Sequence, residues 1–264
     1  MELYNAIFLR KSTRKYSGRK LPEELLQGVK AAVENAERLY ASIDMKIHVV
    51  EAGEKVQEVL PGIVGSYGKV RAPHYLVITS EEKEGFLQNI GYTVEKVVLK
   101  LTTMGIATCW LGGGSKKELW GSVADIPDNH VPVLLVAFGF AAENESPYRD
   151  KTSKIKRKDI SQITAGAMDL TWSKIVSAVR VAPSAVNSQP WRIIFQDGRV
   201  YVFCDGNSNA IFKHFFGSLN MVDIGIALCH LEVAALNFSK TVRFSKDLSA
   251  EYKAYEYVTT VMEI

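Results

Sequence analysis

Residues 182–191 read Ala-Pro-Ser-Ala-Val-Asn-Ser-Gln-Pro-Trp, and this stretch separates a helical pattern from an extended one. Pro183 ends the helical pattern, because proline lacks the amide hydrogen that a helix interior needs. Small residues and an amide pair follow, and then Pro190 and Trp191. We interpret the stretch as one part of a ligand site whose other part lies elsewhere in the chain.

The other part is a basic stretch near the N-terminus, residues 10–14, which reads Arg-Lys-Ser-Thr-Arg. If this stretch is extended, alternation places Arg10, Ser12 and Arg14 on one face. Two guanidinium groups beside a hydroxyl suit phosphate and hydroxyl oxygens, since arginine binds such oxygens through charge-assisted bonds. The alternative is a solvated basic turn, and the motif alone does not exclude it.

Composition and charge narrow the class of protein. The chain has 264 residues, of which 47% are hydrophobic and 23% charged, as in ordinary globular proteins of one large or two smaller domains. The net charge of +3 is too weak to argue for nucleic acid, although it suits a small anionic ligand. No nucleic-acid partner is expected.

The cysteines and histidines show no spacing that is typical of a metal site or a disulfide framework. Cys109, Cys204 and Cys229 stand singly, which favours reduced thiols inside the cell. The N-terminus has no signal-peptide layout, and the longest apolar run, residues 131–142, is too short to cross a membrane. We expect a soluble, cytoplasmic protein without a metal or a membrane partner.

Hydrophobic periodicity predicts alternating helices and strands. Helices are expected over residues 2–9, 22–36, 89–104, 170–181 and 220–237. Strands are expected over residues 46–50, 70–80, 106–111, 132–139, 192–195, 200–204, 241–244 and 255–261. Asp197-Gly198 predicts a hairpin turn between two of these strands.

Two further segments invite a functional interpretation. Gly112, Gly113 and Gly114 end a predicted strand; they form either a flexible turn or a place where backbone N–H groups approach a flat ligand. Residues 143–158 are a polar and basic connector, in which Lys156 and Arg157 are either solvated or close over a phosphate.

The two parts of the chain are weakly similar to each other. With an offset of 146, Val33 corresponds to Val179 and Ile47 to Ile193; farther on, residues 89–91 correspond to 223–225, each at the start of a long helix. Each half retains one of the two motifs and lacks the other. We therefore predict an α+β fold of two mixed-sheet halves, residues 1–165 and 166–264, which form an internal pseudo-dimer with one site.

These motifs resemble signatures of the nitroreductase family of FMN oxidoreductases, in the subgroup with two nitroreductase-like halves in one chain. Residues 10–16 are similar to the N-terminal flavin signature, and residues 182–191 closely resemble the second signature. Residues 105–113, 137–140 and 156–158 are similar to the family's glycine-ended strand, its late strand and its closing basic group.

The resemblance implies FMN at a site that takes residues from both halves. The side chains and backbone groups implied in cofactor binding are those of Arg10, Lys11, Ser12, Arg14, Gly112, Gly113, Gly114, Lys156, Arg157, Pro183, Ser184, Ala185 and Asn187. Gln189 and Trp191 are expected to be structural. No side chain is assigned a catalytic acid or base role, because the flavin carries the chemistry.

The implied function is an FMN-dependent NAD(P)H oxidoreductase that passes hydride in a ping-pong cycle from NADH or NADPH to a nitroaromatic, quinone or similar small-molecule acceptor. One alternative is another flavin chemistry on the same fold, such as reductive dehalogenation. A second is a non-catalytic flavin or ligand-binding protein, because a fold does not fix a function. Fusion of the halves also predicts a monomer.

Overall fold

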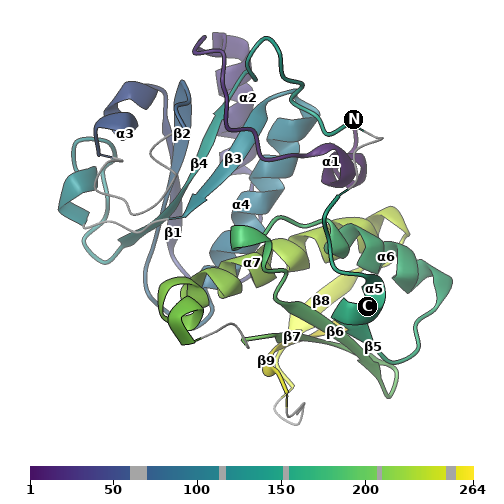
Figure 1. The fold of residues 1–264 in the computed structure, drawn as a ribbon. Helices are drawn as coiled ribbons and strands as arrows, with labels where there is room; N and C mark the ends of the chain where they lie inside the picture. Colours follow the sequence, from purple (N-terminus) through teal and green to yellow (C-terminus); the bar gives the residue numbers. More distant parts are fainter. Residues whose placement is uncertain (60–69, 113–116, 151–154, 207–209, 248–253) are drawn as a thin grey trace. The chain divides into compact units, whose positions relative to one another are not determined.

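Two β-sheets organise the chain, one in each of two units (Figure 1). The computed structural model groups Met1–Phe86 with Lys96–Ser153, and Leu87–Glu95 with Lys154–Ile264. It describes the whole chain apart from residues 60–69, 113–116, 151–154, 207–209 and 248–253, and apart from the side chains of residues 118–119 and 210–218.

The sheet of the first unit has the strand order β1-β2-β4-β3. Its strands are β1 (Met45–Val50), β2 (His74–Ser80), β3 (Ala107–Gly112) and β4 (Val131–Gly139). Neighbouring strands of this sheet pair antiparallel. An isolated parallel bridge joins Ser12 to Thr108 of β3. All seven residues of β2 are buried.

Helices flank these strands along the chain. They are α1 (Leu3–Leu9), α2 (Glu23–Glu34), α3 (Gly53–Val59), α4 (Phe86–Thr103) and the short 3-10 helix η3 (Lys117–Trp120). Pro22 caps α2, and Glu23 and Glu24 in its first turn complement the helix dipole. The core against the sheet includes Tyr75, Leu135 and the fully buried Trp120.

The sheet of the second unit has the order β5-β6-β7-β9-β8. Its strands are β5 (Thr164–Ala165), β6 (Trp191–Gln196), β7 (Arg199–Cys204), β8 (Val242–Ser245) and β9 (Glu256–Glu263). β5 pairs parallel with β6, and the other pairs are antiparallel, so this sheet is mixed. Asp197 and Gly198 form the predicted hairpin turn, with φ of 51° and 71° as in a type I′ turn.

The helices of the second unit are α5 (Ile160–Ile163), α6 (Leu170–Arg180), η4 (Ala185–Asn187) and α7 (Ala210–Asn237). Among the described residues, Leu219–Asn237 is the one helical segment that is long and apolar enough to cross a membrane. Of that window, 78% is buried within the protein, which is the pattern of a core helix. His230 of α7, fully buried, bonds the Ala178 carbonyl of α6 and Glu95 of α4 at 3.0 Å each.

Each sheet repeats the same order of elements. β1, β2, α4, β3 and β4 of the first unit follow the same sequence and pairing as β6, β7, α7, β8 and β9 of the second. β1 and β6 are offset by 146 residues at both ends (191 − 45), which is the offset that the sequence predicts. The last residues of α4 and α7, Thr103 and Asn237, are 134 positions apart (237 − 103). The α+β fold with two repeated sheets is confirmed.

The structure also corrects several sequence predictions. α4 begins at Phe86 and α7 at Ala210, so residues 89–91 and 223–225 lie inside these helices and not at their starts. α3, η3, α5, η4 and β5 were not predicted, because each is too short to show a period. The second compact unit contains Leu87–Glu95 as well as Lys154–Ile264, and α5 and β5 pack with β6 inside it.

Candidate functional site

The stretch that begins at Pro183 forms a tight loop in the second unit, residues 184–189, which we call the 184–189 loop. α6 ends at Arg180, and Pro183 is buried just beyond it. Val186, Asn187 and Gln189 have φ of 47°, 59° and 51°, the left-handed region that side chains other than glycine rarely adopt. Such a backbone persists only where its surroundings hold it.

Hydrogen bonds within the loop and to α7 hold this conformation. The Gln189 amide donates to the Ser184 hydroxyl oxygen at 3.0 Å. Asp223 of α7 accepts from the Ala185 amide with both carboxylate oxygens at 3.1 Å, and from the Ser188 hydroxyl at 3.2 Å. Burial raises the pKa of Asp223 to about 8, although the bonds from Ala185 and Ser188 act in the opposite direction.

The basic residues 156–158 lie directly against the same loop. Arg157 donates from Nη1 to the Asn187 side-chain oxygen at 2.6 Å and from Nη2 to the Val181 carbonyl at 3.3 Å. The Lys158 amide donates to the Gln189 side-chain oxygen at 2.7 Å. Lys156 accepts from the Asn187 side chain through its carbonyl, and its own side chain is exposed. The structure therefore brings together two motifs that lie about 30 residues apart.

The amide side chains of this loop serve the protein itself. Asn187 accepts from Arg157 and donates to Lys156, so both ends of its amide are engaged. Gln189 is buried and donates to the Asn187 carbonyl, and Trp191 is fully buried at the start of β6. Both residues are thus buried, and Gln189 is bonded within the protein, as is expected of structural residues. Ser184 accepts through its oxygen, and its proton remains for a ligand.

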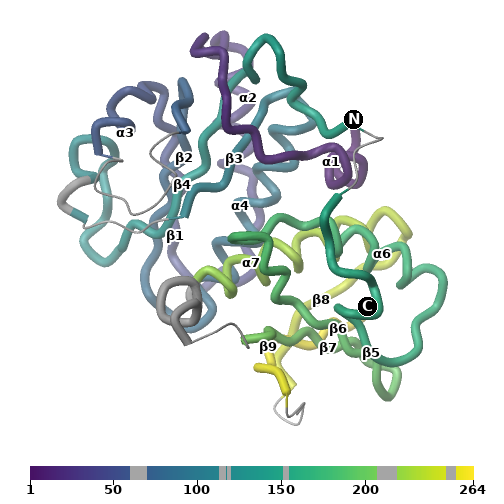
Figure 2. The backbone as a smooth tube through the Cα atoms, in the orientation of Figure 1, coloured from purple at the N-terminus to yellow at the C-terminus, as the bar shows by residue number. Residues whose placement is uncertain are grey.

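The N-terminal basic segment lies along β3 in the first unit. Ser12 bridges Thr108, and the Thr13 amide donates to the Thr108 carbonyl at 2.9 Å. Figure 2 shows the purple segment passing beside the teal chain that follows β4, where Arg10 bridges Tyr148. Gly112 is the last residue of β3, whereas Gly113 and Gly114 lie outside the described residues.

The basic side chains do not share one face as the alternation predicts. Arg10 is 3% exposed and Ser12 half-buried, whereas Arg14 is exposed, because isolated bridges and not a continuous strand hold the segment. Lys11 forms an ion pair with Glu145 at 3.8 Å.

Arg149 is a further cation beside Arg10 that the sequence analysis missed. Its amide donates to the Leu9 carbonyl at 2.7 Å, and its guanidinium donates to the Phe8 carbonyl at 3.3 Å. Burial first, and the charge of Arg10 second, lower the pKa of Arg149 to about 10. Two guanidinium groups close enough to repel each other favour an anion in their neighbourhood.

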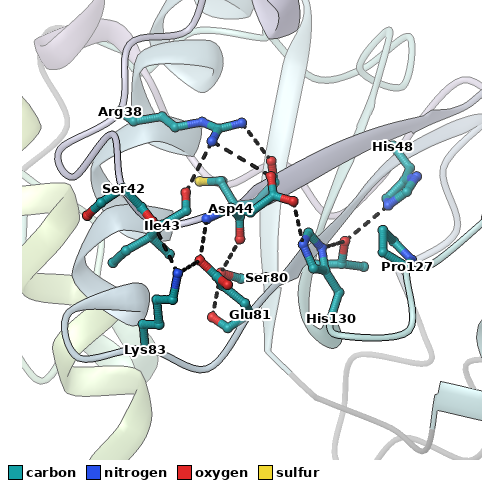
Figure 3. Close-up of polar contacts among 12 residues, drawn as sticks. Arg38, Ser42, Ile43, Asp44, His48, Ser80, Glu81, Lys83, Pro127 and His130 are labelled. Atoms are coloured by element: carbon teal, nitrogen blue, oxygen red, sulfur yellow. Dashed lines mark hydrogen bonds and ion pairs between the residues drawn. The ribbon is translucent and has the colours of Figure 1, made fainter.

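The first-half counterpart of the loop, residues 36–45, is closed by its own arginine (Figure 3). Arg38 donates to the carbonyls of Ile43 at 3.1 Å and Met45 at 2.9 Å, and it lies 3.9 Å from the Asp44 carboxylate. The Asp44 amide in turn donates to Glu81 at 2.7 Å.

A chain of polar contacts continues from Asp44 into the sheet. His130 lies 3.2 Å from the Asp44 carboxylate, and Thr79 lies 3.1 Å from both His130 and His48 (Figure 3). Because a carboxylate only accepts, His130 donates from Nε2, and its Nδ1 accepts from Thr79 when the ring is neutral. Burial, followed by the charges of Lys46 and His130, lowers the pKa of His48.

Neither unit shows a metal site in the part of the chain that the structure describes: no group of three or more His, Cys, Asp or Glu side chains is placed to hold an ion. The predicted binding residues are divided between the two units. Arg10, Ser12, Arg14 and Gly112 belong to the first unit, and Arg157, Ser184 and Ala185 belong to the second. Guanidinium groups and hydroxyls are donors that suit phosphate and hydroxyl oxygens of a ligand.

Comparisons with known proteins agree with the fold. A family model described as "Putative TM nitroreductase" matches residues 2–235. The crystal structure of a protein from Thermotoga maritima MSB8, described as a "putative nitroreductase", is 23% identical, with a TM-score of 0.63 over 100% of this chain and 94% of that chain.

Two nitroreductase structures with bound FMN match part of the chain. One, from Bacteroides fragilis, is 20% identical and covers 59% of this chain and 96% of its own, with a TM-score of 0.48. The other, from Desulfitobacterium hafniense, is 21% identical and covers 60% of this chain and 100% of its own, with a TM-score of 0.47. A search of curated proteins gives no match.

Proposed function

Because the chain belongs to the nitroreductase family, we propose that it is an FMN-dependent oxidoreductase that takes hydride from NADH or NADPH and passes it to a nitroaromatic, quinone or similar acceptor. When bound, FMN supplies this two-electron chemistry. The protein binds and orients the cofactor and controls which molecules reach it.

The observation that carries the proposal is the bond between Arg157 and Asn187. It joins the closing basic group to the 184–189 loop, two segments that the sequence marks separately as flavin-binding. In this arrangement, Arg157 and the exposed Lys156 supply positive charge for a phosphate. Ser184 retains a hydroxyl proton that can be donated to a ligand oxygen.

The proposal also assigns Arg10, Ser12 and Arg14 to the same flavin, on the basis of the family's shared-site pattern. Ser12 lies along β3, whose last residue, Gly112, leads toward the proposed backbone contacts of Gly113 and Gly114. A cation near the pyrimidine edge stabilises a reduced, anionic flavin. No acid or base side chain is required, since the described residues need only bind, orient and exclude water.

Anaerobic reduction tests the proposal directly. Flavin-loaded protein is expected to lose its absorbance near 450 nm when NADH or NADPH is added, and to regain it when a quinone or nitroaromatic is added. Dithionite serves as the control, because it reduces a protein-bound flavin without a nicotinamide site. Bleaching by dithionite with no response to either nicotinamide contradicts the proposal and indicates a non-catalytic flavin-binding protein.

A further inference from the structure

Asp223 is a buried carboxylate that contacts the 184–189 loop and that the sequence motifs do not mark. Asp223 lies in α7 and is 4% exposed. The Ala185 amide donates to both of its oxygens at 3.1 Å, and the Ser188 hydroxyl donates to Oδ2 at 3.2 Å. Ala185 and Ser188 bracket Val186 and Asn187, two of the residues with left-handed backbone. Asp223 therefore fixes both ends of the strained part of the loop.

On its other side, the loop is held by the Arg157 guanidinium and by the backbone amide of Lys158. Arg157 bonds the Asn187 side chain at 2.6 Å, and the Lys158 amide bonds Gln189 at 2.7 Å. Loss of the Asp223 contacts leaves these anchors in place but releases the Ala185 amide and the Ser188 hydroxyl. With fewer contacts to compensate the left-handed conformation, such a loop relaxes more readily toward ordinary backbone angles.

On the basis of the proposed flavin function, we propose that Asp223 is a positioning residue which holds the 184–189 loop in its flavin-binding conformation, and that its ionisation links FMN affinity to pH. As a carboxylate, Asp223 only accepts, which matches the two donors that face it. As a neutral acid it carries a donor of its own and accepts more weakly, since charge-assisted bonds are about twice as strong as neutral ones.

The environment of Asp223 sets the pH range in which this change is observed. Burial raises its pKa to about 8, so the carboxylate forms between about pH 7 and pH 9. The titratable group that faces it from β7 is Cys204, whose own pKa is raised to about 12 by burial and by the charges of Glu256, Asp205 and Asp223. Cys204 therefore stays neutral in this range. Beyond the loop, burial first and the charge of Arg192 second lower the pKa of Lys158.

The first experiment is an FMN titration, followed by flavin fluorescence, of the wild type and of Asp223→Asn at pH 7.0 and pH 9.0. The wild type is expected to bind about fivefold more tightly at pH 9.0, which corresponds to the difference between a charged and a neutral hydrogen bond. Asparagine has the same shape and accepts from Ala185 without ionising. Asp223→Asn should therefore bind as the wild type does at pH 7.0 and show no change at pH 9.0.

A second variant, Ser188→Ala, keeps the carboxylate and removes one of its donors. We expect its pH response to be smaller than that of the wild type but present. Both pH values lie above the second ionisation of the FMN phosphate, near pH 6, so the cofactor itself contributes little to the difference.

Unfolding of the apo protein separates positioning from simple stability. The pKa of Asp223 is raised in the folded protein, so its neutral form contributes to the free energy of unfolding. This contribution is complete below about pH 4, the usual pKa of the group, and is lost as the pH rises through about 8. Wild-type apo protein should therefore become less stable toward pH 9.0 while its FMN affinity increases. A merely structural role predicts that both quantities fall together.

Two results overturn the inference: a wild-type affinity that is equal or weaker at pH 9.0, or an Asp223→Asn variant with the same pH response as the wild type. Absence of saturable FMN binding by the wild type at both pH values is a different outcome. It overturns the proposed function, and the inference with it.

Discussion

Val186 has φ of 47° and ψ of 22°, a left-handed conformation that is unfavourable for a β-branched residue. Its side chain is 56% exposed, so burial of this side chain does not compensate the strain energy. Strained residues of this kind cost about 1–3 kcal/mol and are concentrated at ligand sites. At Val186 the strain lies in the loop to which we assign the flavin.

We predict that Val186→Asn raises the free energy of unfolding of the apo protein by about 1 kcal/mol, because asparagine tolerates the left-handed region. Urea denaturation measures the change. Val186→Ala is the matched control. It removes the branched side chain but retains a Cβ at positive φ, so its free energy of unfolding should rise by less than that of Val186→Asn. Equal or lower stability of Val186→Asn would show that the loop is not strained at this position.

At the scale of elements, the segment Leu87–Glu95 of α4 and the helix α7 approach each other through glycines. A Cβ on Gly91 would overlap the Val222 carbonyl oxygen, and a Cβ on Gly225 would overlap the Gln88 carbonyl oxygen. The two contacts are related by the offset of 134 that also relates the ends of these helices (225 − 91 and 222 − 88). Reciprocal contacts of this kind are the pattern of a two-fold interface in a homodimer.

We expect Gly91→Ala to destabilise the protein by about 1–3 kcal/mol, because a backbone carbonyl cannot move without shifting a helix. Thermal unfolding provides the measurement. Gly28→Ala in α2 is the matched control, since its Cβ would meet only the flexible end of Met104 at 2.5 Å and alanine favours a helix. Similar stabilities for the two variants would contradict the close helix contact.

The longer elements could be predicted from the sequence because their hydrophobic periods are long and regular. β1, β2, β4, β6 and β7 fall within a few residues of their predicted ranges, and the Asp197-Gly198 turn has the expected geometry. The start of α7 was predicted ten residues too late, at Asn220 instead of Ala210. Short elements such as β5 have no period to detect.

The candidate site was predictable only in part. The motifs identified the 184–189 loop and Arg157, because their residue types are unusual at that spacing. Asp223 and Arg149 were not identified, because their roles arise from tertiary contacts with Ala185 and with the carbonyl of Phe8. Nothing in the local sequence distinguishes them from ordinary charged residues. The prediction that Arg10, Ser12 and Arg14 share one face was wrong for the same reason. Bridges to distant segments determine how exposed each of these side chains is.

At the scale of the whole molecule, the repeated order of strands and long helices supports an origin by duplication. In the 184–189 loop, the Ser184 hydroxyl retains a proton that can be donated to a ligand. The counterpart of this loop, residues 36–45, is closed by Arg38 and tied to Glu81. The central claim is therefore that a chain with two nitroreductase-like halves binds a single flavin.

A titration of the purified protein with FMN, read by flavin fluorescence against a known chain concentration, tests this claim most directly. Light scattering on the same sample gives the mass, which we expect to be that of one chain. The account predicts saturation at about one FMN per chain, as for one retained site of a fused pair. Saturation at two FMN per chain, or no saturable binding, would contradict it.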